Sequence, residues 1–274
     1  MENTKTVKAL KKQLVAAIAM VLVAAVALGS STYAWFVSNN SVKGTTTTIS
    51  AQSNSAYLVI DDKTTTTDST ALAVLTGADV KLYPAQWANH FDADKGKSES
   101  GIYQFESAYA KDKDAAAEKD GTRFAVGDAK TAFDEKYAHL NTFYIGTGTY
   151  DGEFTNLKVS DLTVTEADDE GLKTAIRLLI KTYAPNKGGY ETTETAWAVV
   201  KYDGSNMVVE SQSNGKKDGI IYEGQFGKTE GDVKVEVYLY YDGADGNVKT
   251  TNLTNLNACG ATATFEATAL EFGK

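Results

Sequence analysis

The sequence contains very little cysteine, histidine or proline for its 274 residues. The single cysteine, Cys259, excludes both an intramolecular disulfide and a cysteine-rich metal site. The two histidines, His90 and His139, are far apart in the sequence, and neither lies in a zinc-protease motif. The sequence also lacks a nucleophile elbow and a phosphate-binding P-loop. We therefore expect a protein that is not an enzyme and has no cofactor.

Positive charge is also scarce. Lysine and arginine together number 27 against 36 for aspartate and glutamate, so the formal net charge is −9. An acidic chain without a basic patch is a poor ligand for phosphate backbones, which argues against nucleic acid as a partner. With 42% hydrophobic and 23% charged residues, the composition is that of a folding chain and not of a disordered one.

The N-terminus has the order of features of a secretory signal peptide. Four lysines precede an uninterrupted apolar run of 15 residues, Leu14–Leu28. A spanning helix needs about 20 apolar residues, so this run fits the core of a signal peptide better than a permanent anchor. Small Thr32 and Ala34 occupy the −3 and −1 positions of a cleavage site before Trp35. We predict that the first 34 residues are removed and the protein is secreted; the alternative is an uncleaved signal-anchor that holds it at the membrane.

Apolar and polar residues alternate with a period of two along much of the remaining chain, which is typical of strands half-buried in a sheet. The clearest cases are 172–182, 233–241 and 261–269. Further strands are expected at 56–61, 70–75, 79–83, 102–109, 142–146, 157–165, 195–202, 206–212 and 219–226. Stacking two such sheets buries both apolar faces, so the sequence predicts an all-β, antiparallel β-sandwich.

Two stretches interrupt the strand pattern. Residues 111–121 are charged and alanine-rich, which indicates an exposed loop or short helix. Residues 128–140 place apolar side chains at helical spacing after Asp128, a possible cap, and predict a short helix packed on the sheets. We expect a single domain over 52–274, elaborated by an insertion around 85–141.

Two acidic loops contain oxygen ligands of the kind that calcium prefers. One holds Asp242, Asp245 and Asn247, and the other spans 166–170. Neither has the 12-residue spacing of an EF-hand, and acidic turns between strands are usually only solvated. These residues are therefore weak calcium candidates, and we assign no metal site.

Aromatic residues offer a different function. Trp87, Trp197 and several of the 15 tyrosines are of the type that lines a sugar-binding face, which makes a monomeric carbohydrate-binding sandwich an alternative. Tyrosine also suits half-buried strands with its ring on the sheet and its hydroxyl in water. The alternation at Tyr238 and Tyr240 fits that structural role equally well.

The segment Gly29–Phe36, followed by the threonine-rich stretch 43–51, resembles the N-terminus of the TasA/camelysin family, and the closing strand 263–268 resembles the family's last strand. These are exported proteins of Gram-positive bacteria whose signal peptide is removed by a SipW-type signal peptidase. The resemblance implies a jelly-roll-like sandwich that assembles into extracellular, pilus-like fibres of the biofilm matrix or cell surface. Camelysin-like members are described as metalloproteases, a further alternative, but no motif here supports carrying over protease residues.

In fibres of this family each subunit lends its N-terminal strand to the next, and the resemblance implies that residues 35–51 are the candidate donor strand here. The assembly residues expected in it are Trp35, Phe36, Val37, Val42, Thr46, Thr48 and Ile49. A β-rich, proline-free segment at a new terminus can add itself to the open sheet edge of a second copy. Such a head-to-tail contact propagates into a homopolymer. The competing interpretation folds the strand back into its own subunit and leaves a monomer.

Overall fold

The structure is a computed structural model, and it describes most of the chain after residue 46. The described residues are 47–53, 58–61, 71–74, 82–89, 102–107, 124–148, 151–165, 171–186, 189–248 and 260–270. The following predicted features lie outside them: the signal peptide with Thr32, Ala34 and Trp35; Phe36, Val37, Val42 and Thr46 of the donor strand; His90; Cys259; and the stretches 111–121 and 166–170.

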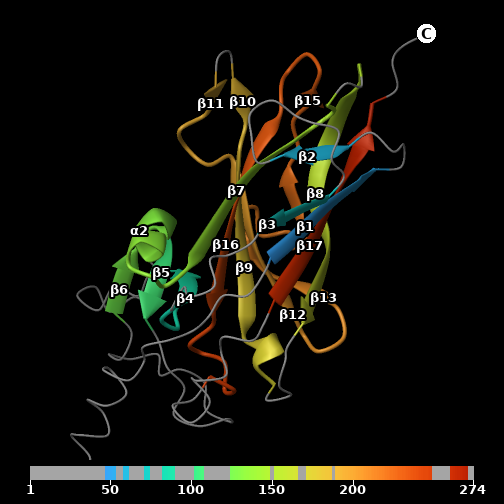
Figure 1. Cartoon of the computed structure of the whole chain (residues 1–274). Helices are drawn as coiled ribbons and strands as arrows, with labels where there is room; N and C mark the ends of the chain where they lie inside the picture. Colours follow the sequence, from blue (N-terminus) through green and yellow to red (C-terminus); the bar gives the residue numbers. More distant parts are fainter. Residues whose placement is uncertain are drawn as a thin grey trace, which may run out of the picture. The chain divides into compact units, whose positions relative to one another are not determined.

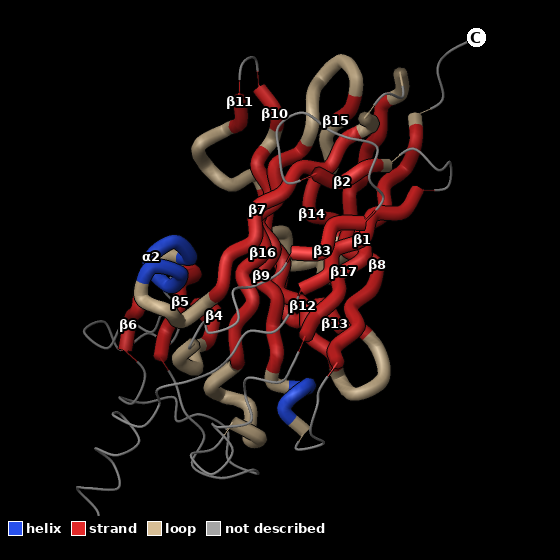
Figure 2. Tube along the Cα trace, viewed as in Figure 1, coloured by secondary structure: helices blue, strands red, loops and turns tan. Residues whose placement is uncertain are grey.

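Two six-stranded sheets pack together as a β-sandwich (Figures 1 and 2). The β17 sheet has the order β14 (Ile220–Tyr222), β8 (Glu153–Thr165), β17 (Gly260–Ala269), β1 (Thr47–Ser53), β3 (Ala71–Val74), with β15 (Phe226–Gly227) also paired to β8. The β16 sheet has the order β13 (Met207–Gln212), β12 (Ala196–Tyr202), β9 (Ile176–Tyr183), β16 (Val233–Tyr241), β7 (His139–Gly146), β2 (Val59–Asp61). The predicted all-β sandwich is confirmed.

The main core lies between these two sheets, where alternate residues of facing strands meet. Ala261, Ala263 and Phe265 of β17 are fully buried there. The ring of Phe265 lies 5.6 Å from the ring of Phe143 on β7, measured between centroids. Burial of a large apolar side chain contributes about 1.5–3 kcal/mol, so this alternating face is what holds the two sheets together.

A second, smaller core covers the opposite face of the β16 sheet. It is formed by the three-stranded sheet β4 (Gln86–Asn89), β5 (Tyr103–Ser107) and β6 (Phe124–Gly127), together with helix α2 (Ala129–Asp134). Phe105 and Ala132 from this layer pack with Leu179 and Tyr240 of the large sheet. The expectation of half-buried strands is therefore wrong for β9, in which seven of eight residues are buried, because both of its faces are covered.

Several element boundaries differ from the sequence prediction. Residues 172–182 begin with a 3-10 turn, Leu172–Thr174, because Gly171 before it takes a left-handed backbone with φ 76°. The segment 219–226 divides into β14 and β15, and the described part of 79–83, Leu82 and Tyr83, is not in a strand. The strands β4, β6, β10 (Pro185–Asn186) and β11 (Gly189–Tyr190) were not predicted.

The predicted helix is confirmed in type but is shorter than 128–140. Asp128 caps it, since the Thr131 amide donates to Asp128 Oδ1 at 2.8 Å. The chain leaves the helix after Asp134 and enters β7 at His139, where pairing to β16 takes over. Among the described residues, no helix is both long and apolar enough to cross a membrane.

Candidate functional site

The described part of the predicted donor strand lies within the β17 sheet of its own chain. All seven residues of β1 pair in parallel with β17, Thr47 with Ala261 through Ser53 with Ala267. On its other side β1 pairs antiparallel with the four residues of β3. Thr48 and Ile49, two predicted assembly residues, are therefore register partners of Thr262 and Ala263.

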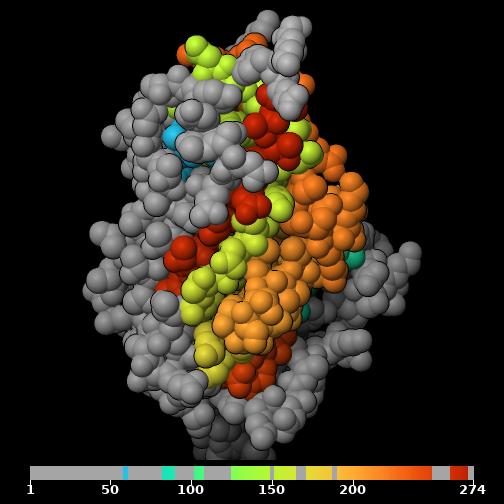
Figure 3. Space-filling model, turned by 90° about the vertical axis from the view of Figure 1, so that its right-hand side faces the viewer, coloured from blue at the N-terminus to red at the C-terminus, as the bar shows by residue number. Residues whose placement is uncertain are grey.

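This position makes β1 an interior strand and leaves β17 with neighbours on both sides. β8 lies along one side of β17, and the two strands run next to each other in the space-filling view (Figure 3). β1 supplies the other side over most of β17's length. Without β1, β17 would present a row of unpaired backbone donors and acceptors.

The calcium candidate Asp242 is engaged with protein groups. It is 7% exposed, and its Oδ2 forms an ion pair with Arg177 Nη2 at 2.9 Å. Its Oδ1 accepts the Ala244 amide at 2.9 Å. Burial raises the pKa of Asp242 to about 6, although Arg177 acts in the opposite direction. Arg177 also pairs with Glu210 at 2.8 Å, so this cluster is a structural ion-pair network.

The other calcium candidates serve the local turn. Asp245 Oδ1 accepts the Asn247 amide, and the Asn247 side chain donates to Thr174 Oγ1 at 3.2 Å. Within the described residues, no group of three or more histidine, cysteine, aspartate or glutamate side chains is placed to hold a metal ion. His139 lies partly buried on β7, where burial lowers its pKa and a hydrogen bond to Asn141 opposes that shift.

The two tryptophans do not line a sugar-binding face, and that part of the sequence interpretation is wrong. Trp87 and Trp197 are 7% and 6% exposed, and their rings meet edge to face at 5.8 Å. They belong to the second core because the small sheet closes over the β16 sheet at this point. Tyr238 and Tyr240 are buried in the same core.

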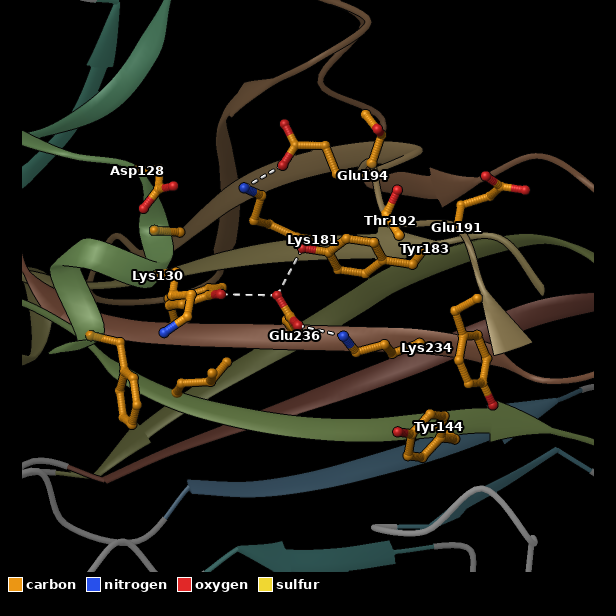
Figure 4. Close-up of a pocket in the computed structure, with 16 residues that line it drawn as sticks. Asp128, Lys130, Tyr144, Lys181, Tyr183, Glu191, Thr192, Glu194, Lys234 and Glu236 are labelled. Atoms are coloured by element: carbon orange, nitrogen blue, oxygen red, sulfur yellow. Dashed lines mark hydrogen bonds and ion pairs between the residues drawn. The ribbon is translucent and has the colours of Figure 1, made fainter. Parts of the chain in front are cut away.

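A groove of about 820 Å³ lies beside this second core, over the outer face of β9, β16 and β7 (Figure 4). We call it the tyrosine groove. Its walls come from α2 on one side and from the segment 190–194 after the β10–β11 hairpin on the other. The residues that line it are Asp128, Ala129, Lys130, Phe133, Leu140, Tyr144, Lys181, Tyr183, Tyr190, Glu191, Thr192, Thr193, Glu194, Lys234, Glu236 and Tyr238.

Glu236 is the centre of the hydrogen-bond network in the tyrosine groove. Lys234 Nζ lies 2.6 Å from its Oε1, and the hydroxyls of Tyr183 and Tyr238 donate to its Oε2 at 2.8 and 2.9 Å. Burial favours the neutral acid, but these three donors outweigh it and lower the pKa of Glu236. Burial and the adjacent Glu236 carboxylate raise the pKa values of Tyr183 and Tyr238.

A second ion pair and two neighbouring aromatic rings also lie in the groove. Lys181 forms an ion pair with Glu194. The rings of Tyr144 and Tyr190 lie 5.1 Å apart between centroids. The groove therefore combines aromatic surfaces with two internal ion pairs, and its residues come from separate strands, helix α2 and a loop.

Sequence reasoning did not find this groove, although one signal for it was present. The alternation in 233–241 places Lys234, Glu236 and Tyr238 on one face of a strand. Their meeting with Tyr183 depends on the register of β16 against β9, in which Lys234 is the partner of Tyr183. That register joins residues about fifty positions apart and is not visible in a local pattern.

The fold and these two features define an all-β sandwich whose first strand is inserted beside its last and which carries a polar aromatic groove. In comparisons with protein-family models, curated proteins and solved structures, none matches this chain.

Proposed function

We propose that this is a secreted structural protein that assembles into extracellular or cell-surface fibres, in which residues 35–51 of one subunit complete the β17 sheet of the next. The observation that supports the proposal is the place of β1, the first described strand, which lies inside the sheet between β17, the last described strand, and β3. The resemblance of the N-terminus to the TasA/camelysin family favours the same function.

The physical argument is that the position beside β17 must be filled, whichever chain supplies the strand. A strand from a second copy makes the same hydrogen bonds in the same register as the subunit's own β1, so exchange costs little. In the sequence, residues 54–58 join β1 to β2, so exchange requires this connection to reach from one subunit to the β17 sheet of the next. Because donor and acceptor surfaces differ, the contact is head-to-tail and continues into a filament.

The residues before β1 would strengthen the contact between two subunits beyond what β1 alone provides. Cleavage after Ala34 leaves Trp35, Phe36 and Val37 at the new terminus. Burial of each large apolar side chain against the accepting subunit contributes about 1.5–3 kcal/mol. The uncleaved precursor should remain monomeric, because its signal peptide retains this segment at the membrane.

Electron microscopy of the mature protein, residues 35–274, tests the assembly directly. We expect filaments from the mature protein and none from a variant lacking residues 35–44. Filaments of unchanged form from the truncated variant would show that this segment is not the donor. Absence of filaments from both proteins over a range of salt and pH would favour the monomeric secreted module.

Cysteine trapping tests which chain supplies the strand. In a Cys259→Ala background, Ser50→Cys and Thr264→Cys are introduced into separate chains, because Ser50 and Thr264 are register partners. Strand exchange predicts disulfide-linked dimers when the two single variants are mixed under assembly conditions. Thr268→Cys is the matched control, since it lies four residues further along β17, roughly 13 Å away. If the mixture stays monomeric and the double variant closes only within one chain, β1 remains in its own subunit.

A further inference from the structure

We propose that the tyrosine groove binds a neutral saccharide through Tyr144, Tyr183 and Tyr190, with the paired side chains Lys234–Glu236 and Lys181–Glu194 as hydrogen-bonding partners. The groove lies on the outer face of the β16 sheet, whereas β1 lies in the β17 sheet. This binding function is therefore separate from the proposed fibre contact and does not depend on it.

The floor of the groove is the face of a β-sheet, and this decides which groups are available to bind a ligand. The strands β9 and β16 have neighbours on both sides, and β7 pairs with β16 on one side and with β2 over Tyr144–Gly146 on the other. The backbone hydrogen bonds of a sheet lie in its plane, so the outer face that floors the groove presents side chains and is not an edge for an added β-strand. A ligand in this groove must be bound by side chains. Those present are tyrosine rings, carboxylates, ammonium groups and threonines, with apolar Ala129, Phe133 and Leu140 on the side of α2 and β7.

The aromatic surfaces favour a ligand with flat apolar faces. Tyr144, Tyr183 and Tyr190 are each partly exposed, unlike the two tryptophans of the second core. The rings of Tyr144 and Tyr190 are close but tilted by 37°, so they form a curved wall and not a closed stack. A sugar ring has such a face in its C–H groups, while its hydroxyls point to the sides, where polar partners are needed.

The charges of the groove favour a neutral ligand over a charged one. Three lysines (Lys130, Lys181, Lys234) stand against four carboxylates (Asp128, Glu191, Glu194, Glu236), and the innermost are paired with each other. The side chains of Lys181 and Glu236 are only 11% and 12% exposed. A charged ligand would have to separate such pairs and leave a partly buried charge without a partner, which is costly.

Hydroxyl groups can use these pairs without breaking them. An ammonium group has three donor hydrogens and a carboxylate has about four acceptor positions, so each keeps capacity after forming one ion pair. One sugar hydroxyl can accept from Lys234 and donate to Glu236, and another can do the same at Lys181 and Glu194. The pKa of Tyr190 is raised to about 12, chiefly by burial, so its ring stays neutral at ordinary pH. The volume of about 820 Å³ lies within the roughly 300–1,000 Å³ usual for ligand sites.

The experiment uses the mature protein and measures retardation in native gels that contain a soluble neutral polysaccharide, followed by calorimetry with its oligosaccharides. Dextran, laminarin, galactomannan and xylan are the neutral probes, and alginate is the anionic comparison. We expect retardation by at least one neutral polymer and little by alginate at moderate salt. The variants Tyr183→Ala and Tyr190→Ala should weaken binding at least tenfold.

Two controls separate binding from folding. Tyr103→Ala removes an exposed tyrosine that lies outside the groove and should leave binding unchanged. Glu236→Gln keeps the shape of the side chain and should weaken binding while thermal unfolding remains cooperative. Retardation by none of the neutral polymers, tighter binding to alginate, or capture only of peptides on a parallel peptide array would each overturn the proposal. A filament-negative protein that still binds dextran or xylan would reject only the fibre function.

Discussion

Lys234 and Tyr183 face each other across the β9–β16 pair, with the ammonium nitrogen 4.6 Å from the centre of the tyrosine ring. The same lysine pairs with Glu236, which in turn accepts the Tyr183 hydroxyl. A charge held both by a carboxylate and by the face of an aromatic ring is fixed in position, because each contact limits the freedom of the other. The relationship gives the tyrosine groove a rigid centre.

Replacing Glu236 by glutamine should lower the free energy of unfolding by about 1–3 kcal/mol, because the ion pair with Lys234 is lost and the tyrosine hydroxyls then meet a neutral amide in place of a carboxylate. It should also lower the pKa values of Tyr183 and Tyr238, since the carboxylate that opposes their ionisation is removed. Titration of phenolate absorbance together with urea unfolding measures both effects. Glu223→Gln, in the exposed pair with Lys216, should change stability by less than about 1 kcal/mol. Equal effects of the two substitutions would contradict the role of Glu236.

Arg177 should be among the most sensitive polar positions of the sandwich. Its side chain is 4% exposed and is shared by Asp242 and Glu210, so Arg177→Ala leaves the buried Asp242 without its cation and Glu210 with Lys201 alone. We expect a loss of about 3–5 kcal/mol in the free energy of unfolding. Arg177→Lys should recover only part of it, because an ammonium cannot reproduce the planar fork of the guanidinium. Lys158→Ala, from an exposed pair with Glu266, is the control and should cost at most about 1 kcal/mol.

His139 should make stability depend on pH on the acidic side of neutrality. Burial lowers the pKa of His139 in the folded protein below its ordinary value of about 6.5, so the unfolded chain binds the proton more readily. The stabilising contribution is therefore complete above about pH 6.5 and is lost as the pH falls through the lower folded pKa.

Urea unfolding of the parent protein and of His139→Gln between pH 7.5 and 5 isolates this effect. We expect the parent to lose more stability than the variant over that interval. Asp242, whose raised pKa acts in the opposite sense, is common to both proteins and cancels in the comparison. Parallel curves would show that His139 does not contribute.

Export should produce a mature chain that begins at Trp35. Intact-mass measurement and N-terminal sequencing of protein from the medium identify the cleavage point. Ala34→Lys should leave the precursor uncleaved, because the −1 position of a signal peptide accepts small residues only. Lys12→Arg keeps the positive charge of the first segment and should be processed normally. A secreted chain still starting at Met1 would reject the signal peptide and with it the free donor strand.

The local pattern of apolar and polar residues was sufficient to predict the class of the fold and its clearest strands and helix. The alternation in Val233–Tyr241 and in Gly260–Ala269 predicted strands. Apolar residues at every second position all lie on one face of an extended chain, and a sheet can bury that face. Asp128 predicted the start of α2, since a side-chain oxygen there satisfies a free amide of the first turn. The single apolar run near the N-terminus likewise led to the prediction of export from sequence alone.

Tertiary structure decided which of these strands have a second buried face and which polar residues meet. Leu179 and Trp197 are buried because the small sheet and α2 pack over their sheet. The sequences of their own strands do not indicate that this additional layer exists. Tyr183 reaches Glu236 only through the pairing of β9 with β16, and β1 reaches β17 only through a pairing between the two ends of the described chain. Such contacts depend on strand order and register, which are set by the packing of the whole molecule and not by the periodicity of any one segment.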